Sequence, residues 1–106
     1  MFKVVFLVNR RADMSRETYQ AYSNEQHAPI VAGLPGIRRY VVNYSLEASP
    51  EDPPAFDAVV ELWFDDQQGF EAALASPRGQ QALADQDNFL DTSKTVFLAV
   101  DEIAVV

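Results

Sequence analysis

The side chain best suited to proton transfer in this chain is its single histidine. His27 lies two residues before Pro29, a residue that should end or bend a helix. Because an imidazole titrates near neutral pH, His27 is the first candidate for a general base or acid. A purely structural histidine, bonded to a backbone carbonyl, is the alternative that the local sequence leaves open.

Two further side chains could take part in such chemistry. Tyr40 could donate a hydrogen bond to a carbonyl or enolate oxygen, or it could simply pack within a strand. Glu61 could act as a second carboxylate in acid–base catalysis. We favour the interpretation that it pairs with Arg10 or Arg39 across neighbouring strands.

Composition excludes several classes of protein. A chain of 106 residues has room for one domain, which we assign to residues 1–106, and its net charge of −8 opposes binding to nucleic acid. The absence of cysteine excludes disulfides and thiolate chemistry. The short apolar run 4–8 indicates a strand rather than a signal peptide. We therefore expect a cytoplasmic protein with neither a nucleic-acid nor a membrane partner.

No motif for a cofactor or a metal is present. The sequence contains no phosphate loop, no dinucleotide fingerprint and no nucleophile elbow. Asp85, Asp87 and Asp91 lie close together, but a calcium loop needs more oxygen ligands and a glycine turn. We interpret these aspartates as a solvated helix surface and expect neither cofactor nor metal.

Strands and helices should alternate along the chain. The hydrophobic pattern predicts a strand over 2–10, a helix from Ser15 to about residue 26, with Tyr19, Tyr22, Gln26 and Ile30 at helical spacing, and a strand over 37–46. A proline-rich loop should follow over 47–55, then a strand over 56–64. A helix capped by Asp65 or Asp66, a second helical segment opened by Ser76 and reaching about residue 89, and a strand over 92–106 complete the prediction.

This order predicts a ferredoxin-like α+β fold, βαββαβ, in which helices cover one face of an antiparallel sheet. Along 56–64 one face is wholly apolar, whereas the other carries Val59, Glu61 and Trp63. Soluble monomers avoid a large bare apolar face, so a second copy should cover it and form a homodimeric α/β barrel. We expect the barrel lumen, lined by Trp63 and Glu61, to bind a small molecule.

Motifs spread over nearly the whole chain resemble the EthD family of dimeric α/β-barrel proteins. They are 9–11 (NRR), 14–15 (MS), Tyr19, Tyr22, 27–29 (HAP), 34–40 (LPGIRRY), 56–58 (FDA), 61–64 (ELWF), 76–77 (SP) and 87–91 (DNFLD). The resemblance implies a ferredoxin-like homodimer without metal or organic cofactor, and a pocket between the outer sheet face and the helices. It does not imply one reaction.

The resemblance also implies site residues. His27 and Tyr40 match a recurrent histidine and a recurrent strand tyrosine that line the active site of isomerase-like members. Trp63 and Phe89 match aromatic positions that would wall the pocket, and Tyr22 stands where many members have tryptophan. The isomerase-like members place further His or Cys groups in the site, and this chain has none, which disfavours methyl-lactone isomerase chemistry.

Two classes of function follow. The first is a cofactor-independent isomerase, cyclase or dehydratase acting on a small apolar carbonyl or aromatic metabolite, with His27 moving a proton and Tyr40 polarising an oxygen. The second is a non-catalytic protein that binds a hydrophobic metabolite in the same pocket. Within the enzyme class, a cofactor-free monooxygenase is an alternative in which Trp63 would matter more than His27.

Overall fold

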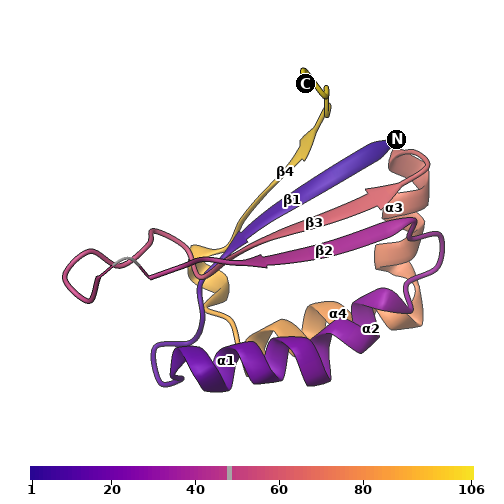
Figure 1. Cartoon of the computed structure of the whole chain (residues 1–106). Coiled ribbons are helices and arrows are strands. Elements are labelled where there is room, and N and C mark those ends of the chain that lie inside the picture. Colours follow the sequence, from indigo (N-terminus) through magenta and orange to yellow (C-terminus); the bar gives the residue numbers. More distant parts are fainter. Residues whose placement is uncertain (48) are drawn as a thin grey trace.

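Four strands form one antiparallel sheet with the order β2-β3-β1-β4. Its strands are β1 (Phe2–Val8), β2 (Arg39–Tyr44), β3 (Ala58–Phe64) and β4 (Val96–Val100). The computed structural model describes residues 1–47 and 49–106. The helices of this part of the chain lie on one face of the sheet (Figure 1), and the ferredoxin-like α+β prediction is confirmed.

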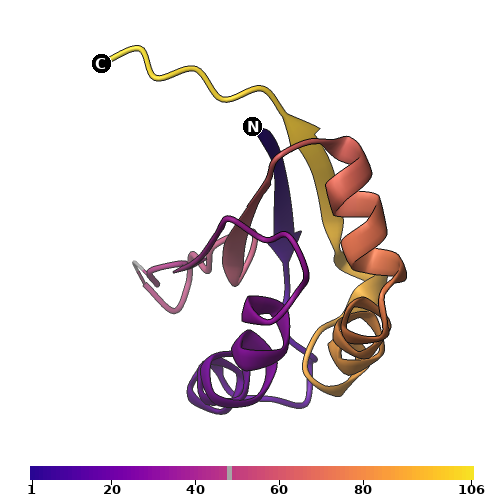
Figure 2. The ribbon, with the colours of Figure 1, turned by 90° about the vertical axis from the view of Figure 1, so that its right-hand side faces the viewer.

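The helical layer consists of two runs, of which the first is continuous and the second turns a corner at Ser76. The first comprises α1 (Arg16–Tyr22), the π-helical turn η1 (Ser23–His27) and α2 (Ala28–Ala32). The second comprises α3 (Gln67–Ala75), α4 (Pro77–Asp85) and the 3₁₀ turn η2 (Gln86–Asn88). Figure 2 shows α4 next to the first run below the strands, whereas α3 rises beside the sheet. Among the described residues, no helix has both the length and the apolar character needed to cross a bilayer.

The predicted face of β3 is confirmed. Ala58 and Phe64 are fully buried and Leu62 is nearly so, all three on the face that meets the helices. Val4 of β1 pairs with Leu62 and belongs to the same core. The alternation of apolar residues therefore decides which face of the sheet the helices cover.

Three side chains that the sequence marks as caps do begin helices. Ser15, Asp66 and Ser76 each accept a hydrogen bond from the backbone N–H three residues later, which satisfies a donor that the first helical turn leaves unpaired. At the corner between α3 and α4, a Cβ on Gly79 would lie 2.1 Å from the carbonyl oxygen of Ala73. Only glycine allows the two helices to approach this closely.

Some predicted bounds are wrong. The first helical run continues to Ala32 instead of ending near residue 26, because the π-helical turn η1 leads directly into α2, which holds Pro29 in its first turn. Helix α4 ends at Asp85, but the 3₁₀ turn η2 carries the helical segment on to Asn88, close to its predicted end near residue 89. The last strand begins at Val96, because a 3₁₀ turn, η3 (Thr92–Lys94), precedes it and is capped by Asp91.

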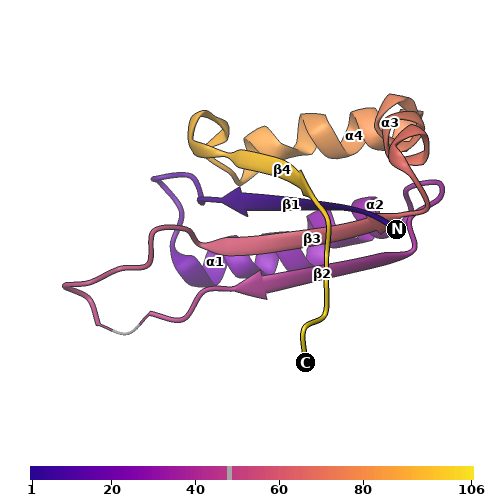
Figure 3. The same ribbon diagram turned by 90° about the horizontal axis from the view of Figure 1, so that it is seen from above.

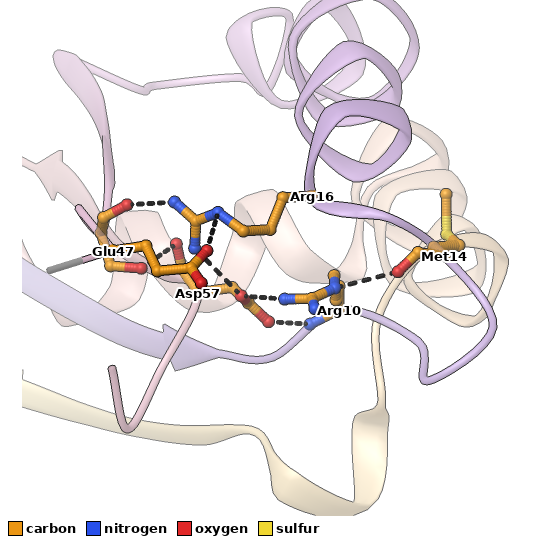
Figure 4. A network of polar contacts seen from close by, with 6 residues as sticks. Arg10, Met14, Arg16, Glu47 and Asp57 are labelled. Carbon is orange, nitrogen blue, oxygen red and sulfur yellow. Dashed lines mark hydrogen bonds and ion pairs between the residues drawn. The ribbon is translucent and has the colours of Figure 1, made fainter. Parts of the chain in front are cut away.

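A buried ionic network fixes the end of the sheet where α1 begins (Figure 4). Asp57, 8% exposed, accepts hydrogen bonds from the backbone nitrogen and the guanidinium of Arg10 at 2.8 and 2.6 Å. Arg16 of α1 donates to the carbonyl oxygen of Ser45 at 2.6 Å and pairs with Glu47 at 3.6 Å. The network thus ties the start of α1 to both ends of the proline-rich loop. Within that predicted loop, residue 48 lies outside the described residues.

Candidate functional site

A cavity with a volume of about 70 Å³ lies between the helical layer and the helix-covered face of the sheet, which we name the inner face. This is room for several water molecules or a small ligand. Much of its wall is apolar and comes from both layers, including Phe6, Val31, Val60, Leu62, Leu74 and Ala82. Leu83, also part of the wall, is 40% exposed, so the cavity reaches the surface beside α4.

The first helical run presents one line of residues to this cavity. Tyr19, Ser23, His27 and Val31 are spaced by four, are all buried and all line it. In a regular α-helix a spacing of four drifts by about 40° per step, since one turn takes 3.6 residues. The wider turn η1 compensates for this drift, so the line stays straight. Of the predicted helical face, Tyr19 is buried and Tyr22 and Ile30 are partly buried against the core, so the prediction is wrong only for Gln26, which is exposed.

His27 is held by a carboxylate on the other helical run. Its Nδ1 lies 2.8 Å from Oδ2 of Asp85, and its ring packs on Phe89 with centroids 4.6 Å apart. An ionised carboxylate only accepts hydrogen bonds, so Nδ1 carries the proton and Nε2 keeps its lone pair. Nε2 has no hydrogen-bond partner among the described residues. The arrangement leaves a proton acceptor at the cavity.

The electrostatics of this pair favour a neutral imidazole. Burial lowers the pKa of His27 below its usual value of 6.5, and the opposing effect of Asp85 does not overcome it. Burial raises the pKa of Asp85, but hydrogen bonds from Tyr22, Asn88 and His27 outweigh it and leave that pKa below its usual value. At neutral pH the site therefore holds an ionised Asp85 behind an uncharged His27.

Four of the six predicted site residues gather here. His27, Tyr40 and Phe89 line the cavity. Tyr22 lies directly behind it: its hydroxyl donates to Asp85 at 2.6 Å, and its ring packs on Phe89 at 5.1 Å.

Trp63 and Glu61 lie on the opposite, outer face of the sheet, so the structure does not bring them together with His27. Nζ of Lys3 lies 2.6 Å from Glu61 and 2.7 Å from Glu102, which also accepts from the Trp63 indole at 3.2 Å. Glu61 does form an ion pair, but its partner is Lys3 on the adjacent strand. The prediction of an arginine partner is therefore wrong. The cavity is distinct from the expected lumen, and a role for these two residues in a barrel stays a prediction.

Sequence reasoning missed Asp85, Tyr19 and Ser23 as site residues. Asp85 was interpreted as a solvated helix surface, yet its side chain is only 12% exposed. The spacing of four that links Tyr19 and Ser23 to His27 was a usable signal. For Asp85 no local signal exists, since its partner lies 58 residues away.

The chain belongs to the EthD domain family, because the family model matches residues 11–93. The predicted resemblance is thereby confirmed.

Three relatives illustrate the match. An uncharacterized 11.0 kDa protein from the thcB–thcC intergenic region of Rhodococcus erythropolis is 28% identical over 102 residues, 96% of each chain. An ethyl tert-butyl ether D (EthD) family protein from Bacillus halodurans has a TM-score of 0.80 at 21% identity, over 97% of this chain and 99% of that one. A dimeric ferredoxin-like protein of unknown function from Thermobifida fusca has a TM-score of 0.73 at 17% identity, over 95% and 90%.

Proposed function

We propose that this protein is a cofactor-independent enzyme of the isomerase, cyclase or dehydratase type, acting on a small apolar carbonyl or aromatic compound. The observation that carries the proposal is the pair of His27 and Asp85 at an apolar cavity, with Nε2 of the ring free. A lowered pKa keeps His27 able to accept a proton at neutral pH.

The step is a proton transfer within the bound molecule. Nε2 takes a proton from a carbon next to the carbonyl, and the electron pair of the broken C–H bond passes to the carbonyl oxygen as an enolate. Tyr40 donates a hydrogen bond to that oxygen. The imidazolium, stabilised by Asp85, returns the proton to another carbon in an isomerisation, or to a departing hydroxyl, released as water, in a dehydration.

The proposal includes a homodimer. Val96 and Leu98 are 47% and 46% exposed, and the register of β1 and β4 places Leu98 opposite Val5 on the outer face. Figure 3 shows that no helix covers this face and that the C-terminal segment 101–106 crosses it. A second copy would bury this apolar surface, as soluble proteins favour. The Thermobifida fusca relative, which is described as dimeric, supports this assembly.

The test is turnover of a panel of lactones and cyclisable polyketones by the wild type, His27→Ala and Tyr40→Phe. We expect His27→Ala to lower kcat/KM by about 10²- to 10⁴-fold and Tyr40→Phe by about tenfold or more. Arg38→Gln is the control, because Arg38 pairs with Asp65 at the surface. Circular dichroism must show that each variant is folded.

Equal turnover by all three proteins would discard the proton-transfer mechanism. A ligand retained through purification, with no turnover by the wild type, would instead favour the non-catalytic binding protein. Turnover that consumes oxygen and does not depend on His27 would favour the monooxygenase.

A further inference from the structure

The polar groups that line the inner cavity are all uncharged at neutral pH. Five residues with polar side chains line it: Tyr19, Ser23, His27, Tyr40 and Gln86. In the part of the lining formed by described residues there is no lysine, arginine or carboxylate. A charged ligand would find no counter-ion in this wall.

The four tyrosines of the chain differ in what their hydroxyls do. Tyr22 and Tyr44 donate theirs within the protein, at 2.6 Å to a carboxylate and at 2.8 Å to a serine. The hydroxyls of Tyr19 and Tyr40 have no hydrogen-bond partner among residues 1–47 and 49–106. Both of these free hydroxyls belong to residues that line the cavity.

Tyr19 is informative because it is only 1% exposed. No described side-chain nitrogen or oxygen is both fully enclosed and without a partner, so the Tyr19 hydroxyl must reach open space. The cavity is the open space that Tyr19 lines. Buried hydroxyls are nearly always hydrogen-bonded, which makes this one a binding group for whatever fills the cavity.

Both free hydroxyls are hydrogen-bond donors at neutral pH. Burial raises the pKa of Tyr40 to about 12, and burial together with neighbouring Tyr44 raises that of Tyr19 as well. A carboxylate ligand would lose its hydration without meeting a cation, and it would be repelled by Asp85 behind His27. A carbonyl oxygen has two lone pairs and can accept from two hydroxyls without such a cost.

We infer that the cavity selects an uncharged carbonyl compound, whose oxygen is bound by the hydroxyls of Tyr19 and Tyr40, and that it rejects carboxylates of the same size. This inference rests on the proposed function, since it names the chemical class that His27 would act on. It adds Tyr19 as a substrate-binding residue.

The test compares three probes of similar shape: acetophenone, benzoate and ethylbenzene. Binding to the wild type and to Tyr19→Phe is measured at pH 7.5 by isothermal titration or ligand-observed NMR. We expect acetophenone to bind at least about tenfold more tightly than benzoate. Tyr19→Phe should weaken acetophenone about three- to tenfold, the effect of one hydrogen bond, and leave ethylbenzene unchanged. The ethylbenzene arm also reports whether the variant keeps its cavity.

Benzoate binding as tightly as acetophenone would overturn the inference. So would an unchanged acetophenone affinity in Tyr19→Phe, or binding of none of the three probes. These outcomes are separate from turnover. If acetophenone and benzoate behave as expected but His27→Ala does not slow any reaction, the proposed enzyme fails while the selectivity of the cavity stands.

Discussion

The two faces of the sheet place their ionisable groups in different states. On the inner side, where the helices cover the sheet, the carboxylate of Asp85 accepts hydrogen bonds from Tyr22, Asn88 and His27. The imidazole of His27 is left neutral, and its Nε2 has no partner among the described residues. On the outer face a cation, Lys3, lies between two carboxylates and beside the Trp63 ring, at 4.6 Å from its centroid.

This difference separates the side of the sheet suited to chemistry from the side suited to assembly. Proximity to Glu102 and Glu61 raises the pKa of Lys3, so the group keeps its proton and cannot act as a base near neutral pH. The outer face is suited to association, because Lys3 is paired with two carboxylates, Arg39 lies over the Trp63 ring, and Val96 and Leu98 are about half exposed. The inner side is suited to proton transfer, because the imidazole of His27 is uncharged at neutral pH and is buried.

The largest expected effect concerns association. Leu98→Arg places a charge on the outer face of each copy, so a two-fold dimer would bury two of them and its dissociation constant should rise by about 10³-fold or more. Leu83→Arg is the matched control, because Leu83 is similarly exposed, 40% against 46%, but lies on the helical side. Native mass spectrometry over a dilution series measures both. A dimer that survives Leu98→Arg but not Leu83→Arg would reverse the roles of the two faces.

The next effect concerns the residue that positions His27. Asp85→Asn removes the charge that stabilises the imidazolium, and kcat should fall by about 10²-fold, more than KM changes. Because a carboxylate raises the pKa of a neighbouring histidine, the acidic limb of the pH–rate profile should also move to lower pH. A merely structural role for Asp85 would leave that limb in place.

A third effect concerns stability against pH. The pKa of His27 is lower in the folded chain than its ordinary value of 6.5, so the unfolded chain takes up a proton first as the pH falls. The contribution of His27 to the free energy of unfolding is complete above pH 6.5 and is lost below that pH. The loss between pH 7.5 and pH 5.5 is at most about 1.4 kcal/mol. Urea denaturation at both values, at one protein concentration, measures the loss. His27→Gln should remove this dependence; persistence of the full loss would assign it to other groups.

The last and weakest effect concerns the hydrogen bonds around Asp85. Tyr22→Phe removes one hydrogen bond to Asp85, which concentrates charge on the side facing His27 and should raise the pKa of His27 slightly. An NMR titration follows this directly, since the chain has one histidine. Tyr44→Phe is the control, because Tyr44 bonds Ser23 instead. A fall in the pKa of His27 would contradict this account of the network.

Much of the fold could be predicted because its signals are local. The apolar alternation of β3 and the caps Ser15, Asp66 and Ser76 follow from short sequence patterns. The same pattern indicated that one face of the sheet would be bare. The candidate site was predicted only in part: His27 and Tyr40 were identified, whereas Asp85 was placed at the surface.

Residue type and periodicity specify the order of the elements, the inner face of β3 and the choice of His27 as the titrating group. These features could therefore be predicted without a structure. Tertiary structure alone decided that Asp85 meets His27, because the packing of two helical runs brings together side chains that lie 58 residues apart. It also decided that Tyr19 opens to a cavity, because that space exists only where the first helical run packs against the inner face of the sheet.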